Sequence, residues 1–174
     1  MMNFKEKLKE IRAFAFDVDG VLSTNSIPLS PAGEPLRCIN IKDGYAIHLA
    51  VLREIPLTII TGGKTESVRV RFADLGVKDI YMGSHRKTDD FADFLQRNNL
   101  TPDQVMYMGD DIPDYEVMQQ VGLAVCPADA APEIKAIAHY VSPYNGGCGC
   151  GRDIIEQVLK AQGLWMNDAV AFGW

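Results

Sequence analysis

The sequence predicts an α/β fold, a parallel sheet with helices on both faces. Short apolar runs alternate with segments of helical spacing, and this alternation is typical of parallel sheets. The chain has 174 residues and is 47% hydrophobic, which suits a single domain over residues 1–174 with a sizeable core.

The elements can be placed in order along the chain. Residues 1–12 are charged and helical in character, and they precede the first apolar run at 13–16. Residues 27–41 are extended around a turn at 30–34 and predict a β-hairpin that projects from the sheet. Further strands are expected at 57–60, 80–82, 105–108, 123–125 and 140–141. Helices are expected at 44–53, 65–75, 87–98, 113–121 and 153–162, followed by an aromatic tail at 164–174.

Charge and hydropathy exclude some classes of partner. The net charge of −6 argues against a nucleic-acid or anionic-membrane surface. The apolar run after residue 12 is too short for a signal peptide or a membrane span. We therefore expect a cytoplasmic protein that binds no membrane.

Three of the predicted strands end in polar sequences that contain glycine. Asp17 and Asp19 precede Gly20 after the first strand, Thr61 and Gly62 follow the second, and a third group carries carboxylates at Asp110, Asp111 and Asp114. Taken singly, each could be an ordinary turn or helix cap. Because the carboxyl ends of parallel strands share one edge of a sheet, we expect the three groups to form one site.

The residue types at this edge favour a magnesium ion and a phosphate group. Clustered carboxylates repel one another, and a divalent cation removes that repulsion. Carboxylate oxygens are hard ligands suited to Mg²⁺, which commonly also contacts substrate phosphate. The Thr61 hydroxyl and the Gly62 amide suit phosphate oxygens. Lys87 could add positive charge, with Lys64 and Arg86 as rival candidates on this reasoning alone.

The order of these groups resembles the four motifs of the haloacid dehalogenase superfamily. The resemblance implies a Rossmann-like core for the parallel sheet. It also implies phosphoryl transfer through an aspartyl-phosphate, with Asp17 as nucleophile and Asp19 as general acid and base. It further implies the remaining roles: Mg²⁺ held by Asp17, Val18, Asp19 and Asp110; phosphate bound by Thr61, Gly62 and Lys87; support from Asp111 and Asp114.

The spacing of the motifs leaves no room for an inserted cap domain. The hairpin, Asp43-Gly44, the loop at Lys64 and the glycine-rich stretch at 146–149 are similar to 3-deoxy-D-manno-octulosonate 8-phosphate phosphatases. That resemblance implies a sugar-acid phosphate substrate, a role in lipopolysaccharide precursor synthesis, and a homotetramer whose sites are completed by a neighbouring subunit. The candidate substrate contacts are Asp43, Gly44, Lys64 and Arg71.

Two positions depart from this pattern. Gly63 and Cys148 stand where many such enzymes carry arginine, so the sugar acid is less firmly indicated than the chemistry. A phosphatase of 2-keto-3-deoxy-nononic acid 9-phosphate is the main alternative. A non-catalytic oligomerisation module is a remote one, because every motif residue is present.

Overall fold

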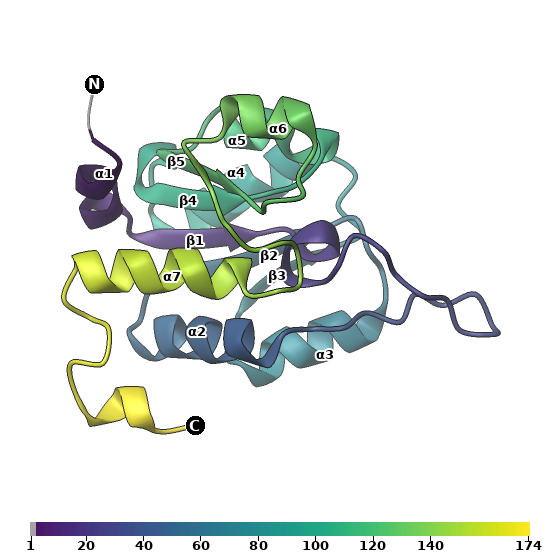
Figure 1. The fold of residues 1–174 in the computed structure, drawn as a ribbon, viewed down its shortest axis with the longest axis horizontal. Helices are drawn as coiled ribbons and strands as arrows, with labels where there is room; N and C mark the ends of the chain where they lie inside the picture. The colour runs from purple at the N-terminus through teal and green to yellow at the C-terminus, as the bar shows by residue number, and fades with distance from the viewer. Residues whose placement is uncertain (1–2) are drawn as a thin grey trace.

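The computed structural model describes residues 3–174 and is built around one parallel sheet (Figure 1). Six strands lie in the order β3-β2-β1-β4-β5-β6, and every pairing is parallel. The strands are β1 (Ala13–Phe16), β2 (Leu57–Thr61), β3 (Asp79–Met82), β4 (Val105–Met108), β5 (Leu123–Cys126) and β6 (Tyr140–Val141). The predicted fold class and all six predicted strands are confirmed.

Helices cover both faces of the sheet (Figure 1). One face carries α1 (Phe4–Glu10), α2 (Ile41–Leu52), α3 (Glu66–Asp74) and α7 (Cys150–Ala161). The other carries α4 (Lys87–Asn98), α5 (Tyr115–Met118) and α6 (Pro132–Ile137). Short helical turns are η1 (Val18–Leu22), η2 (Pro102–Gln104), η3 (Ile112–Asp114) and η4 (Ala169–Phe172).

The central strand β1 is buried on both sides, as its continuous apolar sequence predicts. Phe14 and Phe16 enter the core beneath α2 and α7, whereas Ala13 and Ala15 enter the core beneath α4 and α5. All four are 0% exposed. Since alternate strand residues point to opposite faces, the large side chains fill one core and the small ones let the opposite helices approach. This packing fixes where Asp17 leaves the sheet.

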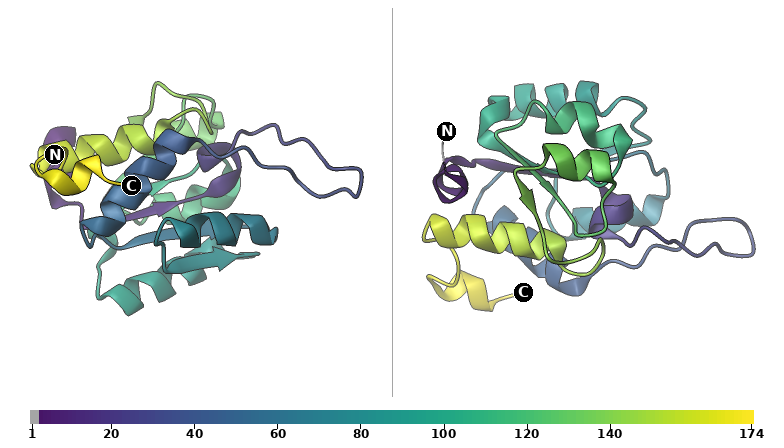
Figure 2. Two further views of the ribbon diagram at one scale, coloured as in Figure 1. Left: turned by 90° about the horizontal axis from the view of Figure 1, so that it is seen from below. Right: turned by 45° about the horizontal axis from the view of Figure 1, so that its top comes forward.

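The segment after η1 projects from the domain, but it is less regular than the predicted hairpin (Figure 2). Its two limbs are joined by one antiparallel bridge, between Leu29 and Pro35. A Pro on one limb cannot donate to a ladder, and the turn is held instead by bonds around Ser30. The predicted hairpin also ends too late, because Ile41 is already in α2, with Asn40 as its N-cap.

Some helix boundaries also differ from the prediction. The last helix begins at Cys150 rather than 153, because the Asp43 carboxylate, from α2, accepts a hydrogen bond of 2.7 Å from the Arg152 amide. A cap supplied from a residue so distant in sequence leaves no local signal. Helix α5 ends at Met118 rather than 121, and α6 had not been predicted.

The C-terminal tail packs against α2 of its own subunit, at the end of the domain remote from the projecting segment (Figure 1). Arg53 pairs with Asp168 at 2.7 Å, and the Tyr45 hydroxyl donates to the Ala171 carbonyl. Phe172 and Trp174 stay 71% and 75% exposed. Among residues 3–174, each helix is too short or too polar to cross a membrane.

Candidate active site

A cavity of about 600 Å³ opens at the carboxyl ends of β1, β2 and β4. The three polar strand ends predicted to converge all line it. Its wall is formed by Asp17, Asp19, Gly20, Asn25, Thr61, Gly62, Gly63, Ser84, His85, Lys87, Asp110, Asp111, Pro113 and Asp114. Asn25, Ser84 and His85 were not among the predicted site residues.

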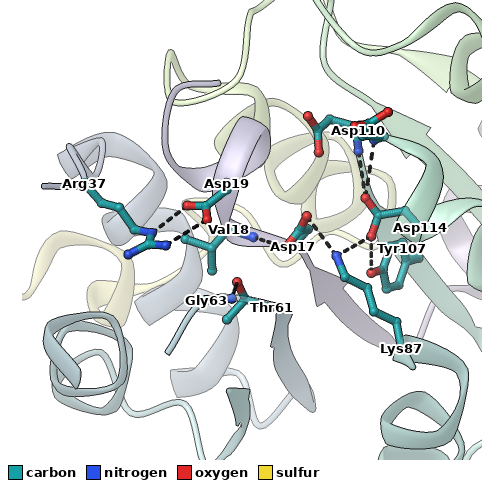
Figure 3. Close-up of polar contacts among 11 residues, drawn as sticks. Asp17, Val18, Asp19, Arg37, Thr61, Gly63, Lys87, Tyr107, Asp110 and Asp114 are labelled. Carbon is teal, nitrogen blue, oxygen red and sulfur yellow. Dashed lines mark hydrogen bonds and ion pairs between the residues drawn. The ribbon is translucent and has the colours of Figure 1, made fainter. Parts of the chain in front are cut away.

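Lys87 is the buried cation of this cavity, with 6% of its side chain exposed (Figure 3). Its ammonium lies 2.8 Å from Asp17 Oδ2 and 2.7 Å from Asp114 Oδ1. Burial alone would lower the pKa of Lys87, but the two carboxylates outweigh it and the net pKa is raised. Lys87 therefore stays protonated beside Asp17. The rival cations lie elsewhere: Lys64 is exposed and lies over Gly83, and Arg86 is the exposed N-cap of α4.

Asp114 is buried and accepts hydrogen bonds on both carboxylate oxygens. Its Oδ1 accepts from Lys87 and, at 2.6 Å, from the Tyr107 hydroxyl, while its Oδ2 accepts from the Asp110 amide at 3.1 Å and the Asp111 amide at 3.5 Å. Burial, followed by the Asp114 charge, raises the pKa of Tyr107 well above its ordinary value, so this hydroxyl remains a donor. With donors on both oxygens, Asp114 orients its neighbours. Tyr107 was missed because it lies in an apolar strand run that gives no sign of its hydroxyl.

Asp17 and Asp110 are the carboxylates best suited to a metal ion. One oxygen from each of Asp17, Asp110 and Asp114 lies within 4.8 Å of the others. Burial, followed by the Asp114 charge, raises the pKa of Asp17, and the same two causes raise that of Asp110 to about 7. Burial and the neighbouring carboxylate both disfavour the ionised forms, and a bound cation would favour them again. A donor set made only of oxygens fits Mg²⁺.

Gly20 shapes the corner of the cavity next to Asp110. Its φ of +82° lies in the region that favours glycine. A Cβ there would collide with the Asp110 carboxylate. The turn after β1 therefore requires glycine twice over, for its backbone conformation and for the close approach of Asp110.

Asp19 lies on the other side of Asp17 from Lys87 and is paired with Arg37, a residue that the sequence did not single out (Figure 3). Arg37 Nε donates to Asp19 Oδ1 at 2.6 Å and Nη2 to Oδ2 at 2.8 Å. Its Nη1 donates to Thr65 Oγ1 at 2.9 Å. Arg37 comes from the projecting segment, and a lone arginine there gave no spacing that linked it to Asp19.

The predicted phosphate-binding strand end is also in place. Thr61, at the end of β2, is 1% exposed, and its hydroxyl accepts from the Gly63 amide at 3.1 Å. Gly62 is exposed, and a Cβ on it would meet only the Ser84 carbonyl at 3.8 Å. Gly62 therefore leaves its backbone open to a ligand on the cavity side.

The four candidate substrate contacts do not line this cavity. Asp43 is fully buried, where it caps α7, and burial raises its pKa to about 6. A Cβ on Gly44 would meet Arg71 Nη2 at 2.7 Å, so these two residues pack α2 against α3. Asp43 and Gly44 belong to the first turn of α2, and contact between these four residues and a substrate stays a prediction.

Comparison with known proteins is consistent with this geometry. A family model described as haloacid dehalogenase-like hydrolase matches residues 60–150. The 3-deoxy-D-manno-octulosonate 8-phosphate phosphatase KdsC of Escherichia coli (strain K12) is 41% identical over 157 residues, which cover 90% of this chain and 84% of that protein. This chain belongs to the haloacid dehalogenase-like hydrolases.

Solved structures of related hydrolases share the whole fold. The 3-deoxy-D-manno-octulosonate 8-phosphate phosphatase of Yersinia pestis has a TM-score of 0.89 and 37% identity, covering 92% of this chain and 86% of that chain. The Moraxella catarrhalis enzyme, in complex with magnesium ion, phosphate ion and KDO, has a TM-score of 0.87 and 29% identity, covering 91% of both chains.

The raised pKa values predict a pH-dependent response to Mg²⁺. Because the folded pKa of Asp110 is about 7 against an ordinary 3.8, stability from this group is present below pH 4 and lost as pH rises through 7. Mg²⁺ at about 100 times its Kd should restore ~2.7 kcal/mol, or about 5–10 °C of Tm, at pH 8, and far less at pH 5. Thermal scans with and without Mg²⁺ measure this difference.

The matched variants are Asp110→Ala, which should lose most of the Mg²⁺ shift, and Asp103→Ala, which should keep it. Asp103 is an exposed aspartate in η2 and does not line the cavity. Equal shifts at the two pH values, or equal shifts in the two variants, would contradict the assignment of Asp110 to the metal.

Proposed function

We propose that this protein is a Mg²⁺-dependent phosphatase that hydrolyses a sugar-acid phosphate through an aspartyl-phosphate on Asp17. The substrate that fits best is 3-deoxy-D-manno-octulosonate 8-phosphate, and the products are the free sugar acid and phosphate. In this proposal the protein is a cytoplasmic enzyme of lipopolysaccharide precursor synthesis.

The observation that carries the proposal is the pairing of Asp17 with Lys87 at the cavity floor. A nucleophilic carboxylate must meet an anionic phosphoryl group, and a protonated lysine 2.8 Å away neutralises charge on both. Asp110 lies close enough to Asp17 to share a cation. The four sequence motifs alone do not give this distance or the burial of Lys87.

The residues divide the reaction into two displacements. An Asp17 oxygen attacks phosphorus, the bond from phosphorus to the ester oxygen breaks, and the leaving alkoxide takes a proton from Asp19. Asp19 then takes a proton from water, which attacks phosphorus and releases phosphate from Asp17. Thr61, Gly62 and Lys87 hold the phosphoryl oxygens throughout.

Asp17, the Val18 carbonyl and Asp110 would hold Mg²⁺, with Asp19 beside them. When bound, the ion supplies positive charge that stabilises the phosphoryl oxygens and lets neighbouring carboxylates stay ionised. Asp111 and Asp114 support this set from behind, since the Asp111 amide and Lys87 both bond Asp114.

The substrate class is supported by the relatives. The E. coli protein, at 41% identity over 90% of this chain, is named for 3-deoxy-D-manno-octulosonate 8-phosphate. The Moraxella structure, at 29% identity, holds magnesium, phosphate and KDO together. A panel of phosphorylated sugar acids that includes the nine-carbon alternative, assayed for phosphate release with Mg²⁺ and with chelator, tests the assignment.

Asp17→Asn should abolish turnover, with a loss of at least about 10⁴-fold in kcat, because an amide is neither a nucleophile nor a good Mg²⁺ ligand. Circular dichroism should remain that of the wild type, since the substitution is isosteric. Substantial phosphate release by contaminant-free Asp17→Asn protein would refute the role of Asp17.

We further propose that the active form is a homotetramer, in which a neighbour's projecting segment or tail completes each site. Leu29 and Leu36 on the projecting segment are 65% and 51% exposed, and Phe172 and Trp174 on the tail are more exposed still. Exposed apolar side chains on the projecting segment and on the tail favour burial in an assembly. The cavity itself has no cap domain above it, because only short connections separate its motifs.

Removing the tail tests which segment closes the site. Deletion of residues 167–174 keeps Leu164 and Trp165, which pack on the core. If the tail covers a neighbour's site, KM for the sugar-acid phosphate should rise about tenfold or more, while a small phosphate ester should be unaffected. Sedimentation velocity gives the assembly state of the same samples.

A fully active monomer would overturn the tetramer. An unchanged KM in a truncated protein that is still tetrameric would exclude the tail and leave the projecting segment as the closing element.

A further inference from the structure

Arg37 occupies a position that the chemistry proposed above does not explain. It reaches from the projecting segment to the rim of the active-site cavity, and its side chain is only 6% exposed. Its guanidinium grips both oxygens of Asp19, at 2.6 and 2.8 Å, and also bonds Thr65. A Cβ on Gly63 would lie 2.8 Å from Arg37 Nη2, so glycine at 63 leaves the space that the guanidinium fills.

This pairing turns Asp19 away from the reaction. Figure 3 shows Asp19 directed toward Arg37, while Asp17 is directed toward Lys87 on the opposite side. With both oxygens facing the guanidinium, Asp19 does not face a phosphoryl group held beside Asp17. For Asp19 to serve the leaving group, the pair with Arg37 has to open.

Opening the pair leaves the Arg37 guanidinium without its carboxylate partner. Asp19 lines the cavity and Arg37 does not, so Asp19 lies between the guanidinium and the ligand space. Once Asp19 rotates toward the phosphoryl group, the Nε–Nη2 edge of Arg37 faces that space unpaired. A poorly hydrated charged donor left without a partner is unfavourable. A carboxylate is the group whose two oxygens match this edge.

The charges around the cavity indicate where that carboxylate would come from. The residues that line it include five aspartates and one lysine, Lys87. Lys87 is already committed to Asp17 and Asp114. A substrate with a carboxylate besides its phosphate would therefore find its matching cation in Arg37.

We propose that Arg37 is a specificity-determining residue that exchanges Asp19 for the carboxylate of the substrate. Binding of a sugar acid replaces one Arg37–carboxylate pair by another and frees Asp19 for the reaction. A sugar phosphate without a carboxylate offers no replacement, so it has to break the pair unaided. This inference rests on the proposed function, and it names how that site selects acidic substrates.

The test compares two substrates in Arg37→Met. The holoenzyme with Mg²⁺ is assayed on 3-deoxy-D-manno-octulosonate 8-phosphate and on glucose 6-phosphate, whose sugar carries no carboxylate. For the sugar acid, kcat/KM should fall about tenfold or more, because a charge-assisted pair is lost. For glucose 6-phosphate, kcat/KM should rise about threefold, because Asp19 is no longer held. Loss of a purely structural contact would not change kcat/KM for the two substrates in opposite directions.

Two further variants accompany it. Thr65→Val removes one contact to the guanidinium. For each substrate it should change kcat/KM in the same direction as Arg37→Met does, by a smaller factor. Arg97→Met is the control, because Arg97 pairs with Asp79 at 3.1 Å and does not line the cavity; it should leave both substrates unchanged.

Equal losses on the two substrates in Arg37→Met would overturn the exchange, as would a gain or no change on both. If the wild type hydrolyses phosphate esters and Arg37→Met loses activity equally on both substrates, this inference alone is overturned. A wild type that hydrolyses no phosphate ester overturns the proposed function, and this inference with it.

Discussion

The site depends on one buried ammonium held between two carboxylates. Lys87, at the first residue of α4, bonds Asp17 after β1 and Asp114 after β4. A lysine this buried is stable only while both partners remain, and removal of one partner costs about 3–5 kcal/mol in comparable pairs. Because Asp114 also accepts from the amides of Asp110 and Asp111, the same ion pair sets the geometry of the loop that follows β4.

The fold makes this constraint possible. Parallel strands deliver three polar ends to one edge, and the buried pairs Phe14–Phe16 and Ala13–Ala15 fix β1 between two cores. Gly20 then turns the chain so that Asp110 can approach. On the remaining side of the cavity, Asp19 is held by Arg37, which links it to the projecting segment. Asp17 and Asp19 are thus held from opposite sides by different cations, Lys87 and Arg37.

Much of this could be predicted from sequence, and the parts that could not share a physical reason. Strand runs and their polar ends are local patterns, so the sheet and the convergence of Asp17, Thr61 and Asp110 followed from them. The cap that Asp43 supplies to α7 could not be predicted, because its partner, the Arg152 amide, is distant in sequence. Arg37 and Tyr107 were missed for the same reason: each acts through a carboxylate brought near only by folding.

The most direct test of the account is the detection of phosphate on Asp17 itself. Asp19→Asn should still permit attack by Asp17 on a reactive aryl phosphate, whose leaving group needs no proton, while slowing release by water. Acid quench, digestion and mass spectrometry should then find a phosphorylated peptide whose modified residue is Asp17. Phosphate found on another residue, or an active enzyme that never accumulates a phosphopeptide in this variant, would contradict the account.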